Sequence, residues 1–138
     1  MYLDYQNLFS NDQAITTSGT TTSTSTIDLG LDSTKLQPNL EKNAKVFIDV
    51  THHFNALTNL TITLQSHGDT GFSTGTKDLW TQTYALAELV LGRIALFDLP
   101  IGAEQYLRLK YYHSGATEDE GTITAGLVLD GQTNGMAD

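Results

Sequence analysis

The sequence predicts an all-β protein, namely an antiparallel β-sandwich of the jelly-roll type with about eight strands and minimal helix. Three observations support this prediction. Apolar and polar side chains alternate over several short segments, which is the period of a half-buried strand. Residues that favour turns, mainly Gly, Ser, Thr and Asn, separate these segments. Few segments follow the roughly 3.6-residue apolar period of a helix. A sandwich or a barrel fits this pattern, and the number of strands favours two sheets.

The length of 138 residues suits a single domain. We expect an N-terminal arm over residues 1–12, a jelly-roll domain over 13–130 and a loose C-terminal tail over 131–138. The chain contains no cysteine, which excludes disulfides and thiolate metal sites. No apolar run approaches the roughly 20 residues of a membrane helix, and the first residues lack the basic start of a signal peptide.

The chain is acidic. Seven Lys plus Arg residues against sixteen Asp plus Glu residues give a net charge of −9. Such a surface repels nucleic acid and anionic lipid, so we expect neither nucleic acid nor a membrane as a partner. The negative charge has two interpretations. It either only keeps the protein soluble, or it complements a basic surface on a partner protein.

The N-terminal residues carry an apolar stripe with three- and four-residue spacing. These side chains either cover the domain's own core or form an arm that contacts a neighbouring protein, since exposed aromatic side chains suit interfaces. We take the arm as the working hypothesis. Its candidate partner-binding residues are Tyr2, Tyr5, Leu8 and Phe9.

The next segments are short or polar. Residues 13–17 are predicted to form a short strand, and residues 27–30 the end of another. Between them, residues 16–26 are rich in Thr and Ser. Because threonine is β-branched and favours extended backbone, we interpret this stretch as a solvent-facing loop or an edge ribbon. Residues 31–44 form a long polar connection with a turn at Pro38.

Two central segments show clear alternation. Residues 45–51 and 60–65 place apolar side chains at every second position, which directs them to one face of a sheet. A Gly-rich loop is expected over residues 66–78. The residues expected to face inward are Val46, Ile48, Val50, Leu60, Ile62 and Leu64.

Residues 79–84 are predicted to form a strand that carries the only tryptophan, Trp80. Residues 85–91 are predicted to form one helical turn, with Gly92 as its C-cap. A single helix over residues 79–91 is the competing interpretation, because the apolar residues there also fit a helical stripe.

A strand, turn, strand unit over residues 93–99 and 105–113 is the element around which the chain is organised. In the second limb Leu107, Leu109 and Tyr111 alternate with polar or amphipathic residues, so a shift by one residue would bury Arg108. A final strand is expected over residues 122–130.

One sequence pattern suggests serine hydrolase chemistry. The stretch Gly71-Phe72-Ser73-Thr74-Gly75 matches G-x-S-x-G, and Asp98 and His113 follow in the order seen in α/β-hydrolases. A nucleophile elbow needs a buried strand that runs directly into the serine and a helix directly after it. Neither is expected here. We therefore predict that the protein is not an enzyme and assign no catalytic residue.

Metal binding is also not expected. His52 and His53 are neighbours on a predicted strand, so their side chains should point to opposite faces and be unable to share one ion. His67 and His113 are isolated. The acidic run Glu118-Asp119-Glu120 lacks the alternating ligand spacing of a calcium loop. No cofactor motif is present, so we assign neither a metal nor a cofactor site.

Three parts of the sequence carry a characteristic spacing of apolar, Gly and Asp residues. They are residues 8–16 with 27–30, the segment Leu99-Pro100 followed by 106–109, and the closing strand over 122–129. Together they resemble the capsid cement (decoration) proteins of Bordetella-phage-type tailed bacteriophages. The resemblance covers nearly the whole chain and includes no catalytic residues.

This resemblance implies a structural virion protein with a jelly-roll fold, made in the host cytoplasm and bound to the outer surface of an icosahedral capsid. Its implied partners are a major capsid protein of HK97-like fold and further copies of itself, as a homodimer or alternatively a homotrimer. A rigid sandwich across the seam between capsomers would add contact area without chemistry, and many copies would act together.

A carbohydrate-binding jelly-roll adhesion module is the second hypothesis. It requires aromatic side chains on an exposed face or loop, because sugar rings stack on them. The candidates are Trp80, Tyr84, Tyr111 and Tyr112. An esterase with Ser73 as nucleophile is the third hypothesis.

Overall fold

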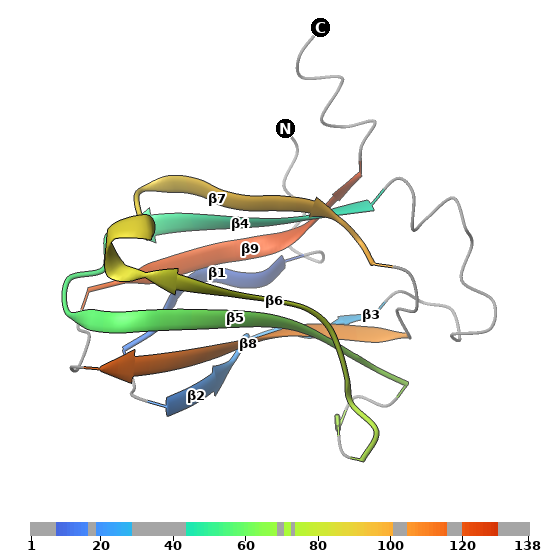
Figure 1. The fold of residues 1–138 in the computed structure, drawn as a ribbon. Helices are drawn as coiled ribbons and strands as arrows, with labels where there is room; N and C mark the ends of the chain where they lie inside the picture. Colours follow the sequence, from blue (N-terminus) through green and yellow to red (C-terminus); the bar gives the residue numbers. More distant parts are fainter. Residues whose placement is uncertain are drawn as a thin grey trace, which may run out of the picture.

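The structure is a computed structural model, and it confirms the predicted sandwich of two antiparallel sheets (Figure 1). The described residues contain nine strands and one short 3-10 helix. No helix in this part of the chain is long and apolar enough to span a bilayer. The structure describes residues 8–16, 19–28, 44–68, 71–72, 74–100, 105–115 and 120–129.

Four strands form one sheet in the order β1-β9-β4-β7. Four more form the other in the order β2-β8-β5-β6, and β3 adds a further pair to β8. The four-stranded sheet contains β1 (Leu8–Ala14), β9 (Thr122–Leu129), β4 (Ala44–His52) and β7 (Gly92–Asp98). The five-stranded sheet contains β2 (Gly19–Thr22), β8 (Tyr106–Gly115), β5 (Leu57–His67), β6 (Lys77–Ala85) and β3 (Ile27–Asp28).

The strand pairing is nested. Apart from β3, the first strand pairs with the last, the second with the next to last, and so on inward: β1 with β9, β2 with β8, β4 with β7 and β5 with β6. A long antiparallel hairpin wound over two sheets gives this order, which is the jelly-roll topology. The predicted sandwich of jelly-roll type is thereby confirmed.

The core lies between the two sheets and contains the residues predicted to face inward. In the five-stranded sheet Leu64 lies opposite Leu109 and Ile62 opposite Tyr111, and all four are 0% exposed. Each such apolar side chain contributes roughly 1.5–3 kcal/mol on burial. The four-stranded sheet contributes Val46, Ile48, Val50, Ile123 and Ala125.

The predicted strand, turn, strand unit consists of β7 and β8, but the two limbs do not pair with each other. β7 pairs with β4 in one sheet, whereas β8 pairs with β5 and β2 in the other. The two limbs therefore belong to different sheets (Figure 1). Alternation determines which face of a strand is buried, but it carries no information about the partner strand.

The helical turn predicted after β6 is the 3-10 helix η3 (Leu86–Glu88). The Glu88 carboxylate accepts a hydrogen bond from the Ala85 backbone N–H at 2.9 Å. Residues 77–85 are strand, which rules out the single helix over 79–91. Gly92 begins β7 with φ of +103° and so is the first residue of a strand instead of a helix C-cap.

The structure corrects the predicted arm at residues 8–12, because strand β1 begins at Leu8. Adjacent strand residues point to opposite faces, and here both faces are covered. Phe9 (0% exposed) lies in the main core, while Leu8 (5% exposed) packs with Phe47 and Val128 in a second cluster. The rest of the arm, with Tyr2 and Tyr5, and the tail over 131–138 lie outside the described residues.

Candidate functional site

The outer face of the five-stranded sheet carries rows of threonines. Thr61 on β5 lies opposite Thr83 on β6, and their hydroxyls are 2.9 Å apart. Thr63 and Thr81 form a second such pair, also at 2.9 Å. Threonine suits an extended backbone, and cross-strand hydroxyl pairs stabilise a sheet. This face is therefore polar, and its side chains are held in place across the strands.

The threonine rows continue into a charged network on the same face. Arg108 Nε donates a hydrogen bond to Gln65 Oε1, and Gln65 Nε2 donates one to Asp78 Oδ1, both at 2.9 Å. The Arg108 guanidinium also lies 4.3 Å from the centre of the Phe72 ring. Partial burial lowers the pKa of Arg108, although the side chain stays charged at any physiological pH. We call Gln65, Asp78 and Arg108 the Gln65 network.

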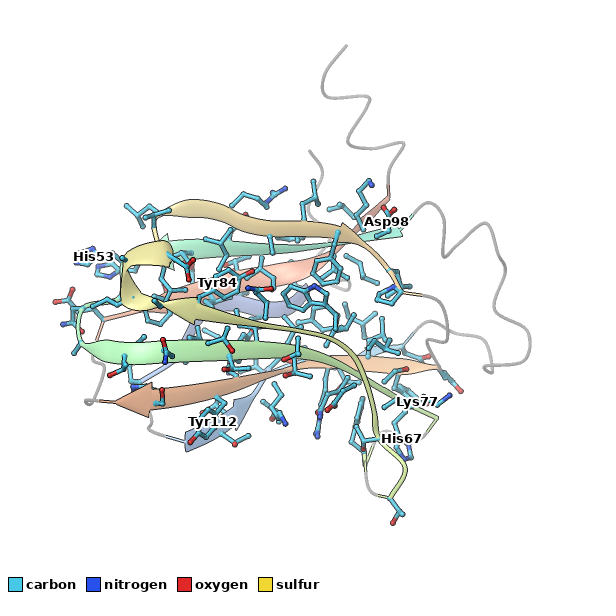
Figure 2. All side chains as sticks on the ribbon, viewed as in Figure 1. His53, His67, Lys77, Tyr84, Asp98 and Tyr112 are labelled. Atoms are coloured by element: carbon cyan, nitrogen blue, oxygen red, sulfur yellow. The ribbon has the colours of Figure 1, made fainter. Side chains whose placement is uncertain are left out.

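Of the four aromatic residues proposed for sugar binding, only Tyr112 is well exposed, at 47% (Figure 2). Trp80 is half-buried and stacks on Phe97 with ring centroids 4.2 Å apart. Tyr84 is also half-buried, and burial followed by the charge of Glu88 raises its pKa. Together with the buried Tyr111, these placements leave no aromatic platform among the four candidates.

Tyr111 joins the two sheets through the core. Its hydroxyl lies 2.7 Å from Ser10 Oγ on β1. Ser10 donates its only hydroxyl hydrogen to Gln13 Oε1 at 2.6 Å, so Tyr111 is the donor to Ser10. Complete burial raises the pKa of the Tyr111 phenol strongly.

Two adjacent apolar side chains are exposed between η3 and β7. Val90 is 59% exposed and Leu91 63% exposed, while the preceding Leu89 is buried at 3%. The Leu89 N–H donates to the Leu86 carbonyl at 3.1 Å, which holds the turn. We call this feature the Val90–Leu91 tip. Sequence reasoning did not single out this tip, although two large apolar residues directly before a glycine could have indicated an exposed apolar turn.

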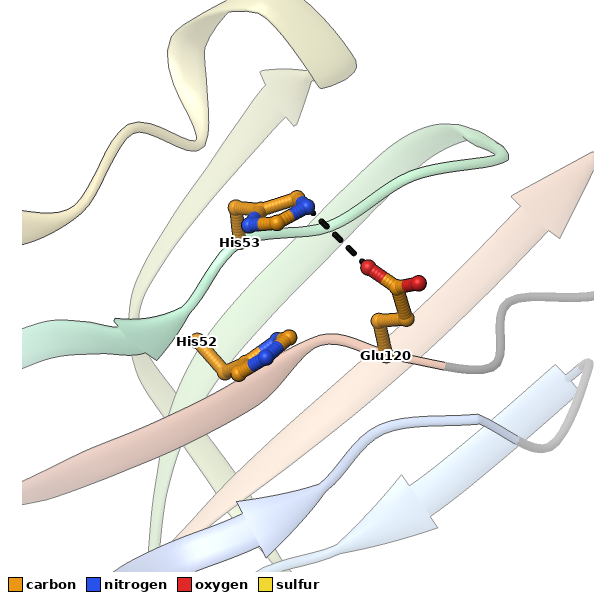
Figure 3. Close-up of side chains that lie close together, drawn as sticks. All are labelled: His52, His53 and Glu120. Atoms are coloured by element: carbon orange, nitrogen blue, oxygen red, sulfur yellow. Dashed lines mark ion pairs between the residues drawn. The ribbon is translucent and has the colours of Figure 1, made fainter.

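His52, His53 and Glu120 lie together at the end of the sandwich (Figure 3). The two imidazole rings stack with centroids 5.0 Å apart, so the expectation that they point to opposite faces was wrong. Its premise fails because β4 ends at His52 and His53 lies beyond the strand. Of the remaining histidines, His67 forms a hydrogen bond between its Nε2 and the Thr74 carbonyl oxygen at 2.7 Å, and His113 is buried.

The residues of the G-x-S-x-G hypothesis are not brought together where they are described. Asp98 ends β7 in the four-stranded sheet and pairs with Lys45 at 2.6 Å. His113 is 1% exposed near the end of β8 in the other sheet, and the two strands end at opposite ends of the sandwich (Figure 1). Ser73, Glu118 and Asp119 lie outside the described residues.

Comparison with known proteins identifies one family. The model of the Bbp16 family matches residues 9–130, which span all nine strands except the first residue of β1. Comparison with curated proteins gives no match. The matched residues include both sheets and the core, so the chain belongs to the Bbp16 family, a family of Bordetella phage proteins.

Proposed function

We propose that this protein is a structural virion protein that binds the outer surface of a tailed-phage capsid and cements neighbouring capsomers of an HK97-fold shell. The observation that carries the proposal is membership of the Bbp16 family over residues 9–130, which makes the chain a phage protein. The resemblance of its apolar and glycine spacing to capsid cement proteins supplies the specific role.

The fold supports this role through its stiffness. Both sheets share one apolar core, and nested pairing connects strands that are far apart in the sequence. A protein that bridges two capsomers must transmit force without deforming, and close-packed interiors are suited to this because they have low compressibility. The net charge of −9 would complement basic patches on a shell and accelerate encounter.

We propose the Val90–Leu91 tip as the contact with the major capsid protein. Exposed apolar side chains that adjoin each other are candidates for an interface. The tip is held by the buried Leu89 and by the hydrogen bonds of η3, so docking would order little additional chain. Tyr2 and Tyr5 stay a second predicted contact.

The proposal includes self-association as a homodimer, with a homotrimer as the alternative. A dimer that spans a seam doubles the number of contacts and gains from effective concentration. Light scattering on the purified protein measures this directly. A mass of two chains supports the homodimer, a mass of three chains supports the homotrimer, and a monomer at high concentration contradicts both.

The test is binding to phage heads prepared without this protein. Purified protein is mixed with unexpanded heads and with expanded heads, which are then sedimented. We expect it to sediment with expanded heads only, because the proposed binding site is the seam between capsomers of the mature shell. Failure to sediment with either form would contradict the proposal. A glycan array serves as the control for the adhesion hypothesis, since a cement protein should bind no sugar on it.

A second measurement locates the contact. Val90→Ser with Leu91→Ser should abolish sedimentation with expanded heads, because it removes the apolar contact without touching the core. Leu96→Ser is the matched control, since Leu96 is also exposed, at 45%, but lies on the four-stranded sheet. Equal loss of binding in both variants would show that the tip is not the contact.

A further inference from the structure

We propose that His52, His53 and Glu120 bind one divalent transition-metal ion of the zinc class. The candidate ligand atoms of the three side chains all lie within 4.8 Å of one another. His53 Nε2 and Glu120 Oε1 are 3.0 Å apart. Two ligands bound to one zinc ion at about 2.0–2.2 Å are themselves roughly 3–3.5 Å apart, so this pair already has the required separation.

The second imidazole completes the set. The His52 and His53 rings stack at 5.0 Å with an angle of 18° between their planes, and both lie on the side from which Glu120 approaches (Figure 3). If this cluster were only an ion pair between His53 and Glu120, His52 would not need to lie beside them. Three converging Lewis-base atoms, by contrast, are what a metal ion requires.

The backbone around the cluster is fixed by tertiary contacts. Thr122 on β9 pairs with His52 on β4, which brings Glu120, two residues earlier, beside the end of β4. Gly121 packs against the ring of the buried Phe54, where a Cβ atom would lie 2.1 Å from the ring. The Gly121 carbonyl accepts a hydrogen bond from the Ile15 N–H at 3.0 Å. The ligands are thus held near one another before any ion binds.

The ligand chemistry selects the class of ion. Imidazole nitrogen suits Zn²⁺, Co²⁺, Ni²⁺ and Cu²⁺, whereas Ca²⁺ and Mg²⁺ prefer sites made of oxygen ligands. Three protein ligands leave at least one coordination position open, which water or a side chain of another protein would fill. The cluster is exposed at the end of the sandwich, so this position faces outward. The site would connect the end of β4 to the start of β9.

The experiment titrates the full-length protein with zinc chloride by calorimetry and with Co²⁺ by visible absorption. His52→Gln, His53→Gln and Glu120→Gln are compared with the control His67→Gln, which alters a histidine outside the cluster. We expect one zinc ion per wild-type chain. Each cluster variant should lower the affinity by more than about tenfold, because loss of a ligand's hydrogen-bonding partner alone already costs roughly 10–100-fold. The control should bind as tightly as wild type.

A second measurement separates metal binding from folding. Zinc should raise the midpoint of thermal unfolding of the wild type and of His67→Gln, since a ligand that binds the folded state stabilises it. The cluster variants should unfold at the wild-type temperature without zinc and show no increase with it. Absence of saturable zinc binding by the wild type, or equal binding by the cluster variants, would overturn the proposal and leave only the His53–Glu120 ion pair. Neither result would bear on capsid binding.

Discussion

The outer faces of the two sheets are built differently. On the five-stranded sheet this face carries threonine pairs and the Gln65 network, all hydrogen-bonded across strands. On the four-stranded sheet, Phe47 is 0% exposed, clusters with Leu8 and Val128, and lies beneath the Arg93 guanidinium. The five-stranded sheet is therefore apolar on one face and polar on the other, whereas the four-stranded sheet is locally apolar on both faces.

This difference is visible in the sequence once the structure is known. β5 alternates apolar and polar residues, which is typical of a strand with one apolar and one polar face. β4 instead contains Val46, Phe47 and Ile48 in succession, and all three are 0% exposed. A continuous apolar run indicates a strand covered on both faces. The comparison predicts that truncating an outward-facing side chain lowers the free energy of unfolding much more in the four-stranded sheet than in the five-stranded sheet.

The largest expected effect is at Phe47. Phe47→Ala should lower the free energy of unfolding by about 3–5 kcal/mol, because it opens a cavity in the second apolar cluster. Thr61→Ala is the matched change on the outer face of the other sheet and should cost about 0.5–1 kcal/mol. Urea denaturation of both variants measures the difference. Similar costs at the two positions would show that Phe47 is not part of a second core.

The Gln65 network should have an intermediate effect. Gln65 is only 6% exposed, and Gln65→Ala leaves both Arg108 and Asp78 without their shared partner. We expect a loss of about 1–3 kcal/mol in the free energy of unfolding. Gln82→Ala, which alters an exposed glutamine on β6, is the control and should be nearly neutral. A neutral Gln65→Ala would mean that water replaces the network at no cost.

Tyr111 tests the link between the sheets. Tyr111→Phe should cost about 0.5–1.5 kcal/mol at neutral pH through the lost hydrogen bond to Ser10. Because burial raises the pKa of this phenol, the folded chain holds the proton more tightly than the unfolded chain. The resulting stability is complete below the ordinary tyrosine pKa of about 10 and is lost as the pH rises above it.

Wild type should therefore lose stability in alkali more steeply than Tyr111→Phe, as measured by urea denaturation between neutral and alkaline pH. Tyr112→Phe, which alters the neighbouring residue on the exposed face, should behave like wild type. An unchanged alkaline slope in Tyr111→Phe would refute the assignment to Tyr111.

The smallest effect is expected at the ion pair between Lys45 and Asp98. The Asp98 side chain is 66% exposed, and exposed ion pairs contribute about 0–1 kcal/mol. Asp98→Asn should therefore change the free energy of unfolding by less than about 1 kcal/mol, and added salt should remove the difference. A larger, salt-independent loss would place this pair among the main stabilising contacts.

The sequence predicted the strands and their buried faces because alternation records burial directly, as in Leu60, Ile62 and Leu64. It did not predict strand partners, since the same alternation at Leu107 and Leu109 fits pairing with any neighbour. It also mistook Leu8 and Phe9 for part of an arm, because adjacent apolar residues on a strand covered on both faces resemble a helical stripe. The cluster of His52, His53 and Glu120 was missed because β4 ends at His52. If the strand included His53, the two imidazoles would point to opposite faces.

The most direct test of the proposed role is the heat stability of DNA-filled heads. Heads prepared without this protein are heated with and without added wild-type protein, and DNA release is followed with a dye. A cement protein should raise the release temperature, and the variant carrying Val90→Ser and Leu91→Ser should not. An unchanged release temperature on heads that are saturated with wild-type protein would contradict the cementing role.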